Sequence, residues 1–484
     1  MTTPTSTPDT NRPAADATQP APGWIQTLAL CFGVWLHAGD SLMTATVMPA
    51  AIGDIGGAAF VYWALALYEL GSIVAGAATG LLALRWGLIR AMVLASLIYA
   101  FGCAVSGLAP DMATLLAGRL LQGLGGGWMM ALAYVGVTVL YPAERWPRIF
   151  GIQSAVWGVS AMVGPAVGAL FAAAGMWRGA FWAFALQALL LAAVVPWVLP
   201  RRQPASLQAS VPWPALTLIV LGVLAVLMAG VQASLAAGAA WIVGGVLVLR
   251  FALRKDSTRS DRLLPRAPLD PFSPWGPGLL MVLLLSMSTV PLFVYGPLIM
   301  AAVYDAPPTV FAAILAAESV AWSVVAVATA RATPRYEPLL IRSGAVAIVL
   351  GVVGLAAFMP SGSLGLVAAA AILQGSGFGA CWGFVIRRIV GRVAPDDHER
   401  ASSAVPTMQI LGYAMGAAAA GLVANALGMG DAMSADTGRR IGFWIFASFL
   451  PLCAVGLWAA WRLARPVAED PDKELGQAGQ PQEL

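Results

Sequence analysis

The chain has 484 residues, of which 59% are hydrophobic and only 10% are charged, and its net charge is +4. So few charged residues cannot cover the surface of a water-soluble protein of this size. The basic residues fall in small groups between apolar runs, which is not the pattern of a nucleic-acid-binding surface. The composition therefore predicts a membrane protein that crosses the lipid bilayer many times and binds no nucleic acid.

The two ends of the chain are polar, and its interior lacks the residue patterns of an enzyme or a metal protein. Residues 1–23 have no apolar core of a signal peptide and predict a disordered cytoplasmic tail, while residues 465–484 predict a second cytoplasmic tail. The four cysteines stand singly and no phosphate-binding loop is present, so no metal and no cofactor are expected. The apolar segments contain no nucleophile–base pair, so an enzyme is not expected either.

Long apolar runs predict the architecture. A helix needs about 20 apolar residues to cross a bilayer. Runs of this length predict fourteen membrane-spanning helices, at residues 24–51, 58–84, 89–108, 112–140, 149–174, 178–199, 212–231, 234–253, 276–304, 309–330, 338–359, 363–386, 401–427 and 440–464. We expect an all-α protein in which 24–199 and 276–464 each form a six-helix bundle. Residues 200–253 add an inserted helix pair, and 254–275 form a cytoplasmic linker.

The positions of the basic residues support this count. If the N-terminus is cytoplasmic, 23 of the 27 Lys and Arg residues lie on the cytoplasmic side. Only Arg178, Arg439 and Arg440 lie on the opposite side, and Arg119 lies within a span. Because cytoplasmic loops are enriched in Lys and Arg, fourteen spans with both termini in the cytoplasm fit the pattern well.

The first two spans carry the first family resemblance. Asp40 stands nine residues before Pro49 in the first span, and Trp63 and Tyr68 are five residues apart in the second. These spacings resemble the fourteen-span drug:proton antiporters of the major facilitator superfamily. A carboxylate in the middle of a spanning helix is costly unless it is paired or protonated, which makes Asp40 a functional candidate. A purely structural, hydrogen-bonded acid is the alternative.

The fourth span contains Gly118-Arg119 followed by Gln122-Gly123, and it is similar to the fourth-helix motif of the same superfamily. A guanidinium cannot lose its proton and is expensive in hydrocarbon, so we expect a carboxylate within reach of Arg119. The alternative is an arginine held by backbone carbonyls alone.

The fifth span and one loop extend the resemblance. Gly164-Pro165 and Gly168 resemble the superfamily's antiporter motif, which is associated with exporters, although such glycines also serve ordinary helix packing. Gly80, Arg85 and Gly87 resemble the motif of the cytoplasmic loop between spans two and three. The match there is incomplete, because Leu84 stands where the family has an aspartate that anchors charge contacts across the cytoplasmic gate.

Three acids lie deep within spans, namely Asp40, Glu69 and Glu318. His37 precedes Asp40 by three residues and should share its helix face. We expect Asp40, His37 and Arg119 to couple transport to protons, and Glu69 and Glu318 to line the substrate cavity. Aromatic side chains are expected to complete the cavity walls, although interfacial belts and packing use the same residues. These are Trp35, Trp63, Tyr68, Trp157 and Trp322.

The resemblance implies a function. It implies a monomeric, proton-driven exporter of lipophilic or cationic small molecules that works by alternating access in the bacterial cytoplasmic (inner) membrane. A narrow-specificity metabolite transporter of the same fold, whether an importer or an exporter, is the alternative within the family. A membrane receptor or a membrane-embedded enzyme is the alternative outside it.

Overall fold

The computed structural model describes residues 23–57, 60–201, 211–232, 234–361, 363–429 and 433–465. Throughout these residues the regular secondary structure is helical. The two predicted tails lie outside the described residues, apart from Gly23 and Arg465 at their inner ends.

Six helices precede the inserted pair and seven follow it. The first group is α1 (Trp24–Ile55), α2 (Val61–Trp86), α3 (Leu88–Gly107), α4 (Met112–Leu140), α5 (Trp146–Ala173) and α6 (Trp177–Val198). The inserted pair is α7 (Trp213–Ala229) and α8 (Leu235–Ser257). The last group is α9 (Gly276–Tyr304), α10 (Pro308–Thr329), α11 (Glu337–Phe358), α12 (Leu364–Val390), α13 (His398–Ala426), α14 (Ala435–Ala447) and α15 (Leu450–Leu463). We call α1–α6 the N-terminal half and α9–α15 the C-terminal half.

Within the described residues, thirteen helical segments are long and apolar enough to cross a membrane, with α14 and α15 together forming one of them. The remaining apolar helix, α7, has 17 residues, or about 25 Å at the rise of an α-helix. It falls just short of the usual span, so the count of fourteen stays a prediction. The last span is broken after Ala447, where Pro451 in the first turn of α15 cannot supply a backbone donor to α14.

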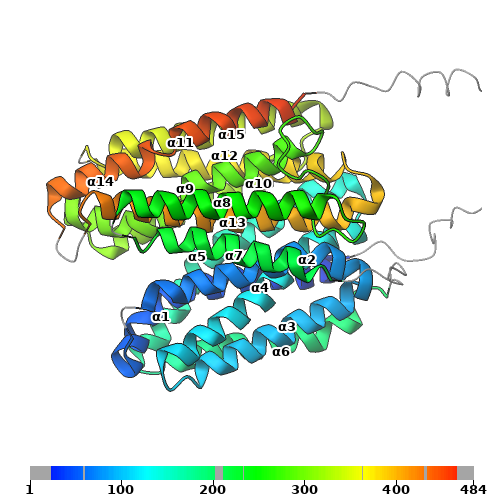
Figure 1. The fold of residues 1–484 in the computed structure, drawn as a ribbon, viewed down its shortest axis with the longest axis horizontal. Coiled ribbons are helices and arrows are strands. Elements are labelled where there is room, and N and C mark those ends of the chain that lie inside the picture. The colour runs from blue at the N-terminus through cyan, green and yellow to red at the C-terminus, as the bar shows by residue number, and fades with distance from the viewer. Residues whose placement is uncertain are drawn as a thin grey trace, which may run out of the picture.

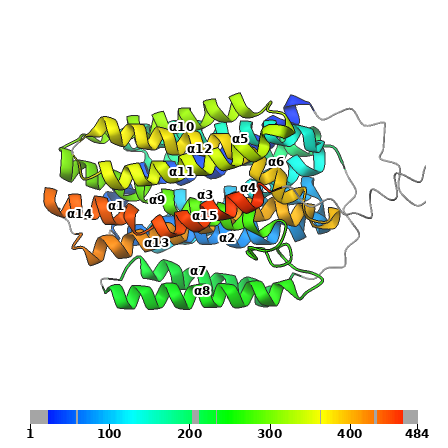
Figure 2. The same cartoon turned by 90° about the horizontal axis from the view of Figure 1, so that it is seen from above.

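The two halves lie side by side, and the inserted pair packs along one flank of the seam between them (Figures 1 and 2). Helix α7 contacts α2 of the N-terminal half and α13 of the C-terminal half. The Tyr62 hydroxyl donates to the Leu227 carbonyl at 3.1 Å, and the Asn425 amide donates to the Gly230 carbonyl at 3.3 Å. The inserted helices therefore touch both halves rather than only one.

Most basic loops gather at one end of the bundle. At this end the start of α1 lies beside the end of α6, and Gln26 donates a hydrogen bond to the Val198 carbonyl at 3.1 Å. The end of α15 meets the end of α12 at the same end, where Arg388 donates to the Leu463 carbonyl at 2.8 Å. We call this the arginine-rich end, and its members include Arg145, Arg201, Arg262, Arg388, Arg392 and Arg400.

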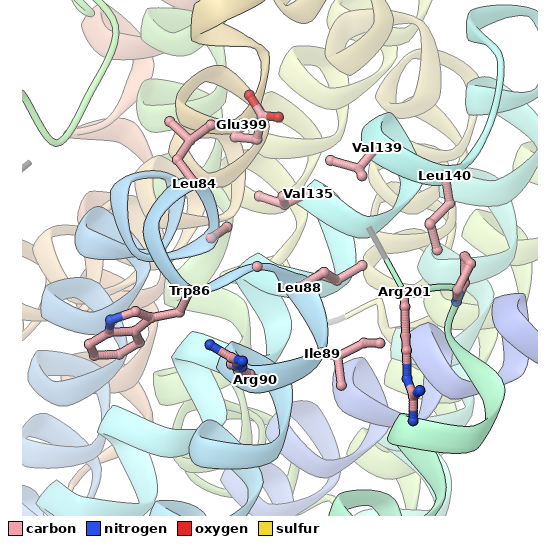
Figure 3. A pocket seen from close by; sticks show the side chains of 13 residues that line it. Leu84, Trp86, Leu88, Ile89, Arg90, Val135, Val139, Leu140, Arg201 and Glu399 are labelled. Atoms are coloured by element: carbon pink, nitrogen blue, oxygen red, sulfur yellow. The ribbon is translucent and has the colours of Figure 1, made fainter. Parts of the chain in front are cut away.

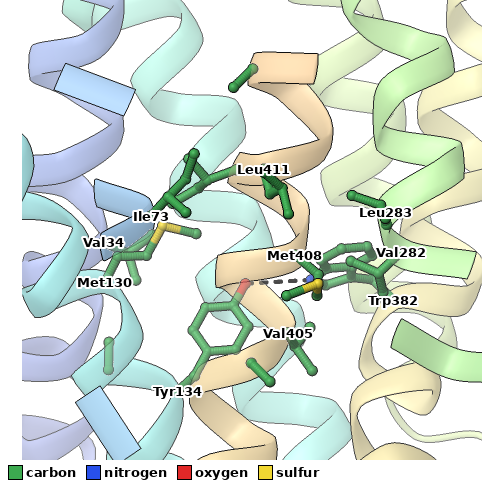
Figure 4. Packing of buried hydrophobic residues seen from close by; sticks show 14 of the residues in the cluster. Val34, Ile73, Met130, Tyr134, Val282, Leu283, Trp382, Val405, Met408 and Leu411 are labelled. Carbon is green, nitrogen blue, oxygen red and sulfur yellow. Dashed lines mark hydrogen bonds between the residues drawn. The ribbon is translucent and has the colours of Figure 1, made fainter. Parts of the chain in front are cut away.

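The two halves are packed tightly together near the arginine-rich end. Apolar side chains of α1, α2 and α4 interleave with those of α9, α12 and α13, and the Trp382 indole donates to the Tyr134 hydroxyl at 3.4 Å (Figure 4). Closer to that end, the hydroxyls of Thr138 and Ser402 are 2.9 Å apart. This packing brings the two halves into direct contact near the arginine-rich end.

Candidate transport site

A buried ion pair joins α1 to α4 in the middle of the N-terminal half. Arg119 Nη1 lies 3.0 Å from each oxygen of Asp40, and both side chains are 0% exposed. The carboxylate expected near Arg119 is therefore Asp40. Two charges taken out of water are tolerated only when they neutralise each other and satisfy their remaining hydrogen bonds.

Neutral groups also bind this ion pair, although Arg119 Nη2 is buried without a hydrogen-bond partner among the described residues. Arg119 also donates to the Ala64 carbonyl at 3.3 Å and to Gln122 Oε1 at 3.1 Å. The Gln122 amide is in turn 3.1 Å from the sulfur of Cys103. The motif residue Gln122 thus holds the guanidinium from the same face of α4, one turn away.

Glycine at position 123 allows the approach of α2 that this geometry needs. A Cβ placed on Gly123 would stand 2.1 Å from the backbone oxygen of Tyr68, so any larger residue would push the two helices apart. Tyr68 itself is fully buried, with the Arg119 guanidinium 4.2 Å from its ring centre. The Tyr68 ring is enclosed between α1 and α4 in the described structure, and its predicted place in the substrate cavity stays a prediction.

His37 is bound to Tyr68 rather than to Asp40 in the described structure. The Tyr68 hydroxyl is 3.1 Å from His37 Nδ1 and donates to the His37 backbone carbonyl at 2.8 Å. The two rings stack with centres 5.3 Å apart, and Trp157 of α5 meets the His37 ring edge-on at 5.9 Å. His37 therefore links the ion-pair region to α5, and its predicted role as a relay stays a prediction.

The glycines of the fifth helix allow α5 to touch the segment of α1 that carries Asp40. A Cβ on Gly164 would lie 2.7 Å from the Gly39 carbonyl oxygen, and one on Gly168 would lie 2.1 Å from the Thr46 hydroxyl. Thr46 also donates to the Pro165 carbonyl at 3.2 Å. The motif thus holds α1 and α5 in contact directly beside Asp40.

The other two embedded acids have no such partner. Glu69 is half-buried on α2, one residue after Tyr68, and one of its oxygens has no hydrogen-bond partner among the described residues. Glu318 on α10 is 2% exposed and accepts a hydrogen bond of 2.9 Å from the Gln374 amide of α12.

The predicted aromatic residues fall into two groups. Trp157 and Trp322 are partly exposed, and the indole nitrogen of each is buried and has no hydrogen-bond partner among the described residues. Trp322 stacks on Phe378, with ring centres 4.7 Å apart. Trp63 and Trp35 make different contacts. Trp63 packs edge-on against Tyr62, and Trp35 hydrogen-bonds to Gln187 of α6 at 2.9 Å.

The loop motif at the arginine-rich end borders a hollow of about 600 Å³ (Figure 3). Gly87 has a φ of 75°, which favours glycine and turns the chain from α2 into α3. A Cβ on Gly80 would lie 2.6 Å from the Cα of Arg400, so this glycine lets the two halves approach. Leu84 and Glu399 both line the hollow, on opposite sides of the seam. Arg85 lies in the last turn of α2.

Several ion pairs at the arginine-rich end involve the C-terminal half and the linker. Asp397 pairs with Arg262 of the linker and with Arg400 at 2.8 Å. Glu337 at the start of α11 pairs with both Arg387 and Arg388. Nearby, burial and the adjacent Arg388 lower the pKa of Arg392 to about 10, which leaves Arg392 charged at neutral pH.

Several of these contacts were not expected from the sequence. Gln374 lies in a glycine-rich stretch of α12, but only the fold shows that it faces Glu318. The linker acid Asp256 binds the backbone N–H groups of Leu263 and Leu264 at 2.9–3.1 Å, which orders the linker against α8. Among the described residues, no three His, Cys, Asp or Glu side chains come together as a metal site would require.

Two helical bundles packed around buried charges, with many membrane-length helices, define a multi-pass membrane protein built to move solutes. The chain belongs to the Major Facilitator Superfamily, whose family model matches residues 30–384. It is therefore a transporter and not an enzyme.

Two relatives are named as multidrug transporters or resistance proteins. The chain is 30% identical over 456 residues to a probable multidrug-efflux transporter of Mycobacterium tuberculosis, covering 90% of this chain and 93% of that protein. It is 28% identical over 155 residues to multidrug resistance protein 3 of Bacillus subtilis, covering 32% of this chain and 30% of that protein.

Solved structures share the fold at low sequence identity. The human organic anion transporter MFSD10 matches with a TM-score of 0.64 and 16% identity, over 91% of this chain and 100% of that one. The proton:xylose symporter XylE matches with a TM-score of 0.63 and 14% identity, over 90% of this chain and 95% of that one. The major facilitator fold predicted for the chain is therefore correct.

Proposed function

We propose that this protein exports lipophilic or cationic small molecules in exchange for protons, by alternating access. We place it as a monomer in the bacterial cytoplasmic membrane, with both termini in the cytoplasm and the proton gradient as its energy source. The arginine-rich end would then face the cytoplasm, as expected from the enrichment of cytoplasmic loops in Lys and Arg.

The observation that carries this proposal is the ion pair of Asp40 and Arg119. The pair is fully buried and joins two different helices. Arg119 favours the ionised form of Asp40 while the two groups are in contact. Any movement of α1 relative to α4 that lengthens this contact weakens that preference, so the carboxylate can take up a proton. A change of conformation is thereby linked to proton binding and release.

Acidic and aromatic groups support the proposed substrate class. Within the part of the chain that the structure describes, each of four side chains has a buried polar atom without a hydrogen-bond partner, namely Glu69, Glu318, Trp157 and Trp322. Carboxylates and aromatic faces attract cations that also have apolar surface. The relatives named for multidrug efflux favour the same class.

Transport by the purified full-length chain in proteoliposomes tests the proposal. We expect an imposed pH gradient to drive the accumulation of a fluorescent lipophilic cation, such as ethidium, against its own gradient. Asp40→Asn should abolish the pH-driven part, because the amide cannot exchange a proton. Asp54→Asn is the matched control, since Asp54 lies on the same helix but half of its side chain is exposed. Unchanged pH-driven transport by Asp40→Asn would contradict the role given to Asp40.

Transport in the same proteoliposomes distinguishes the proposed function from the alternative within the family. A narrow-specificity metabolite transporter would ignore structurally unrelated cations and would accelerate only with its own substrate class on the opposite side of the membrane. Competition by several unrelated lipophilic cations is the expected result for the proposed function.

A further inference from the structure

Glu318 and Gln374 form a closely packed pair between α10 and α12. Glu318 lies in the middle of α10, 2% of it is exposed, and Gln374 is 0% exposed. A Cβ on Gly375 would stand 2.4 Å from the Glu318 backbone oxygen, so α10 and α12 are in direct backbone contact beside the pair. The acid is therefore held between two helices rather than free to turn toward solvent.

No cation faces Glu318 among the described residues. Its carboxyl group accepts a hydrogen bond from the Gln374 amide at 2.9 Å. On the helices packed against α10, the arginines are Arg148 in the first turn of α5 and Arg387 and Arg388 in the last turn of α12. All three lie at the arginine-rich end, and α9 contains no charged residue. The contrast with Asp40 is direct, because Asp40 is bound by Arg119.

The Glu318–Gln374 pair lacks one hydrogen-bond donor. The Gln374 amide donates to Glu318 Oε1 at 2.9 Å. Glu318 Oε2 and Gln374 Oε1 are both buried and have no donor among the described residues. A carboxylate has no proton to donate, whereas a neutral carboxylic acid has one O–H group. If the amide were turned over, two acceptor oxygens would face each other, and a proton would be needed between them instead.

We propose that the Glu318–Gln374 pair is a second proton-binding site, in the C-terminal half, and that Glu318 holds its proton while the arginine-rich end is closed. The proton adds to Glu318 as O–H, neutralises the charge and supplies the missing donor. The inference rests on the proposed proton coupling and extends it from one carboxyl group to two. A substrate cation that entered beside Glu318 would favour the ionised form and release this proton.

Infrared spectroscopy of the full-length protein in lipid tests the site without any transport measurement. We expect the wild type at neutral pH to show the carbonyl stretch of a buried neutral carboxyl group, and Glu318→Gln to lose that band. Glu69→Gln is the matched control, an embedded acid on the other half, and it should retain the band. The band should also disappear at alkaline pH and decrease when ethidium binds.

A second variant, at Gln374, tests the same site without removing the Glu318 carboxyl group. Gln374→Leu removes the amide but leaves the carboxyl group, so the band should remain and shift to the higher frequency of a weaker hydrogen bond. The same band in wild type and Glu318→Gln would overturn the proposal. So would a Glu318 band that persists unchanged at alkaline pH and with ethidium, because it would mark a structural acid that never exchanges its proton. Failure of ethidium export with a normal band titration would overturn the proposed function and leave this site intact.

Discussion

The two halves of the molecule differ in where their acidic groups are paired with arginines. In the N-terminal half the deep acid Asp40 is bound by Arg119, while Leu84 at the arginine-rich end offers no charge. In the C-terminal half the deep acid Glu318 has no cation, while Glu337 at the arginine-rich end binds two arginines. Two similar bundles thus place their fixed ion pairs at different depths. The N-terminal half holds a charge pair at the centre, and the C-terminal half holds one at its end.

The largest expected effect comes from breaking the central pair. Arg119→Leu leaves the Asp40 carboxylate buried without a cation, which should destabilise the protein by about 3–5 kcal/mol. Thermal unfolding of the purified protein in detergent measures this loss. Adding Asp40→Leu to the same chain should restore much of the stability, but not transport, because no buried charge is then left alone.

Arg178→Leu is the control for this experiment. Arg178 and Asp54 form a half-exposed pair at the opposite end, so this variant should cost less than about 1 kcal/mol. If the double variant were as unstable as Arg119→Leu alone, the cost would come from lost packing rather than from the unpaired charge.

A smaller effect is expected at the end of the C-terminal half. Glu337→Gln removes the carboxylate that holds Arg387 and Arg388, whose side chains are 20% and 16% exposed. Because the arginines retain some access to water, we expect a loss of about 1–3 kcal/mol in the same unfolding measurement. Glu144→Gln is the matched control, since Glu144 is exposed at the same end. Equal losses in both variants would mean that the ion pairs of Glu337 contribute no specific stability.

The next variant tests whether the linker helps to keep the arginine-rich end closed. Asp397→Asn weakens the contacts with Arg262 and Arg400, and the backbone of Arg400 packs on Gly80 of the other half. We expect a shift of about 1 kcal/mol toward the open arrangement, which is roughly a five-fold change in equilibrium. A cysteine at Thr138, which contacts Ser402 across the seam, should then react faster with a thiol reagent.

Asp436→Asn controls for that measurement. Asp436 and Arg439 form an exposed pair on α14, away from the arginine-rich end, and their loss should leave the labelling rate unchanged. The four native cysteines are buried, so the introduced thiol dominates the signal. A rate that does not change with Asp397→Asn would show that apolar packing alone keeps this end closed.

The sequence was sufficient to predict the major facilitator fold and a carboxylate within reach of Arg119, but not the pairing in the C-terminal half. Long apolar runs and the motifs around Asp40 and Arg119 carry strong signals, since charges in hydrocarbon demand a partner. Glu318 and Gln374 are 56 residues apart, and their contact depends on how α10 packs on α12. No spacing along the chain encodes that packing.

The sequence also did not predict the directions in which individual side chains point. Tyr68 belongs to a recognisable spacing, but the spacing does not say which neighbour its ring faces, and the ring turned out to lie between His37 and Arg119. At Leu84 the sequence showed that the aspartate typical of the family is absent. It did not show that Asp397 forms ion pairs at the same end of the molecule. One of those pairs, Arg262–Asp397, joins the linker to the N-cap residue of α13 across 135 residues of sequence.

The smallest expected effect tests the comparison most directly. Glu318→Gln removes no ion pair, and the new amide can both donate to and accept from Gln374, so the two orphaned oxygens no longer lack a donor. We therefore expect a change in stability of less than about 1 kcal/mol, or a slight gain. Asp40→Asn is the matched variant in the other half, and it should be clearly destabilising because Arg119 then remains charged and buried without a carboxylate. If both substitutions lowered the unfolding temperature equally, Glu318 would have to be ionised and held by a positive charge, and the difference between the halves would be lost. If only Asp40→Asn did so, each half would have its own way of tolerating an acid in the membrane, one by a fixed cation and the other by a proton.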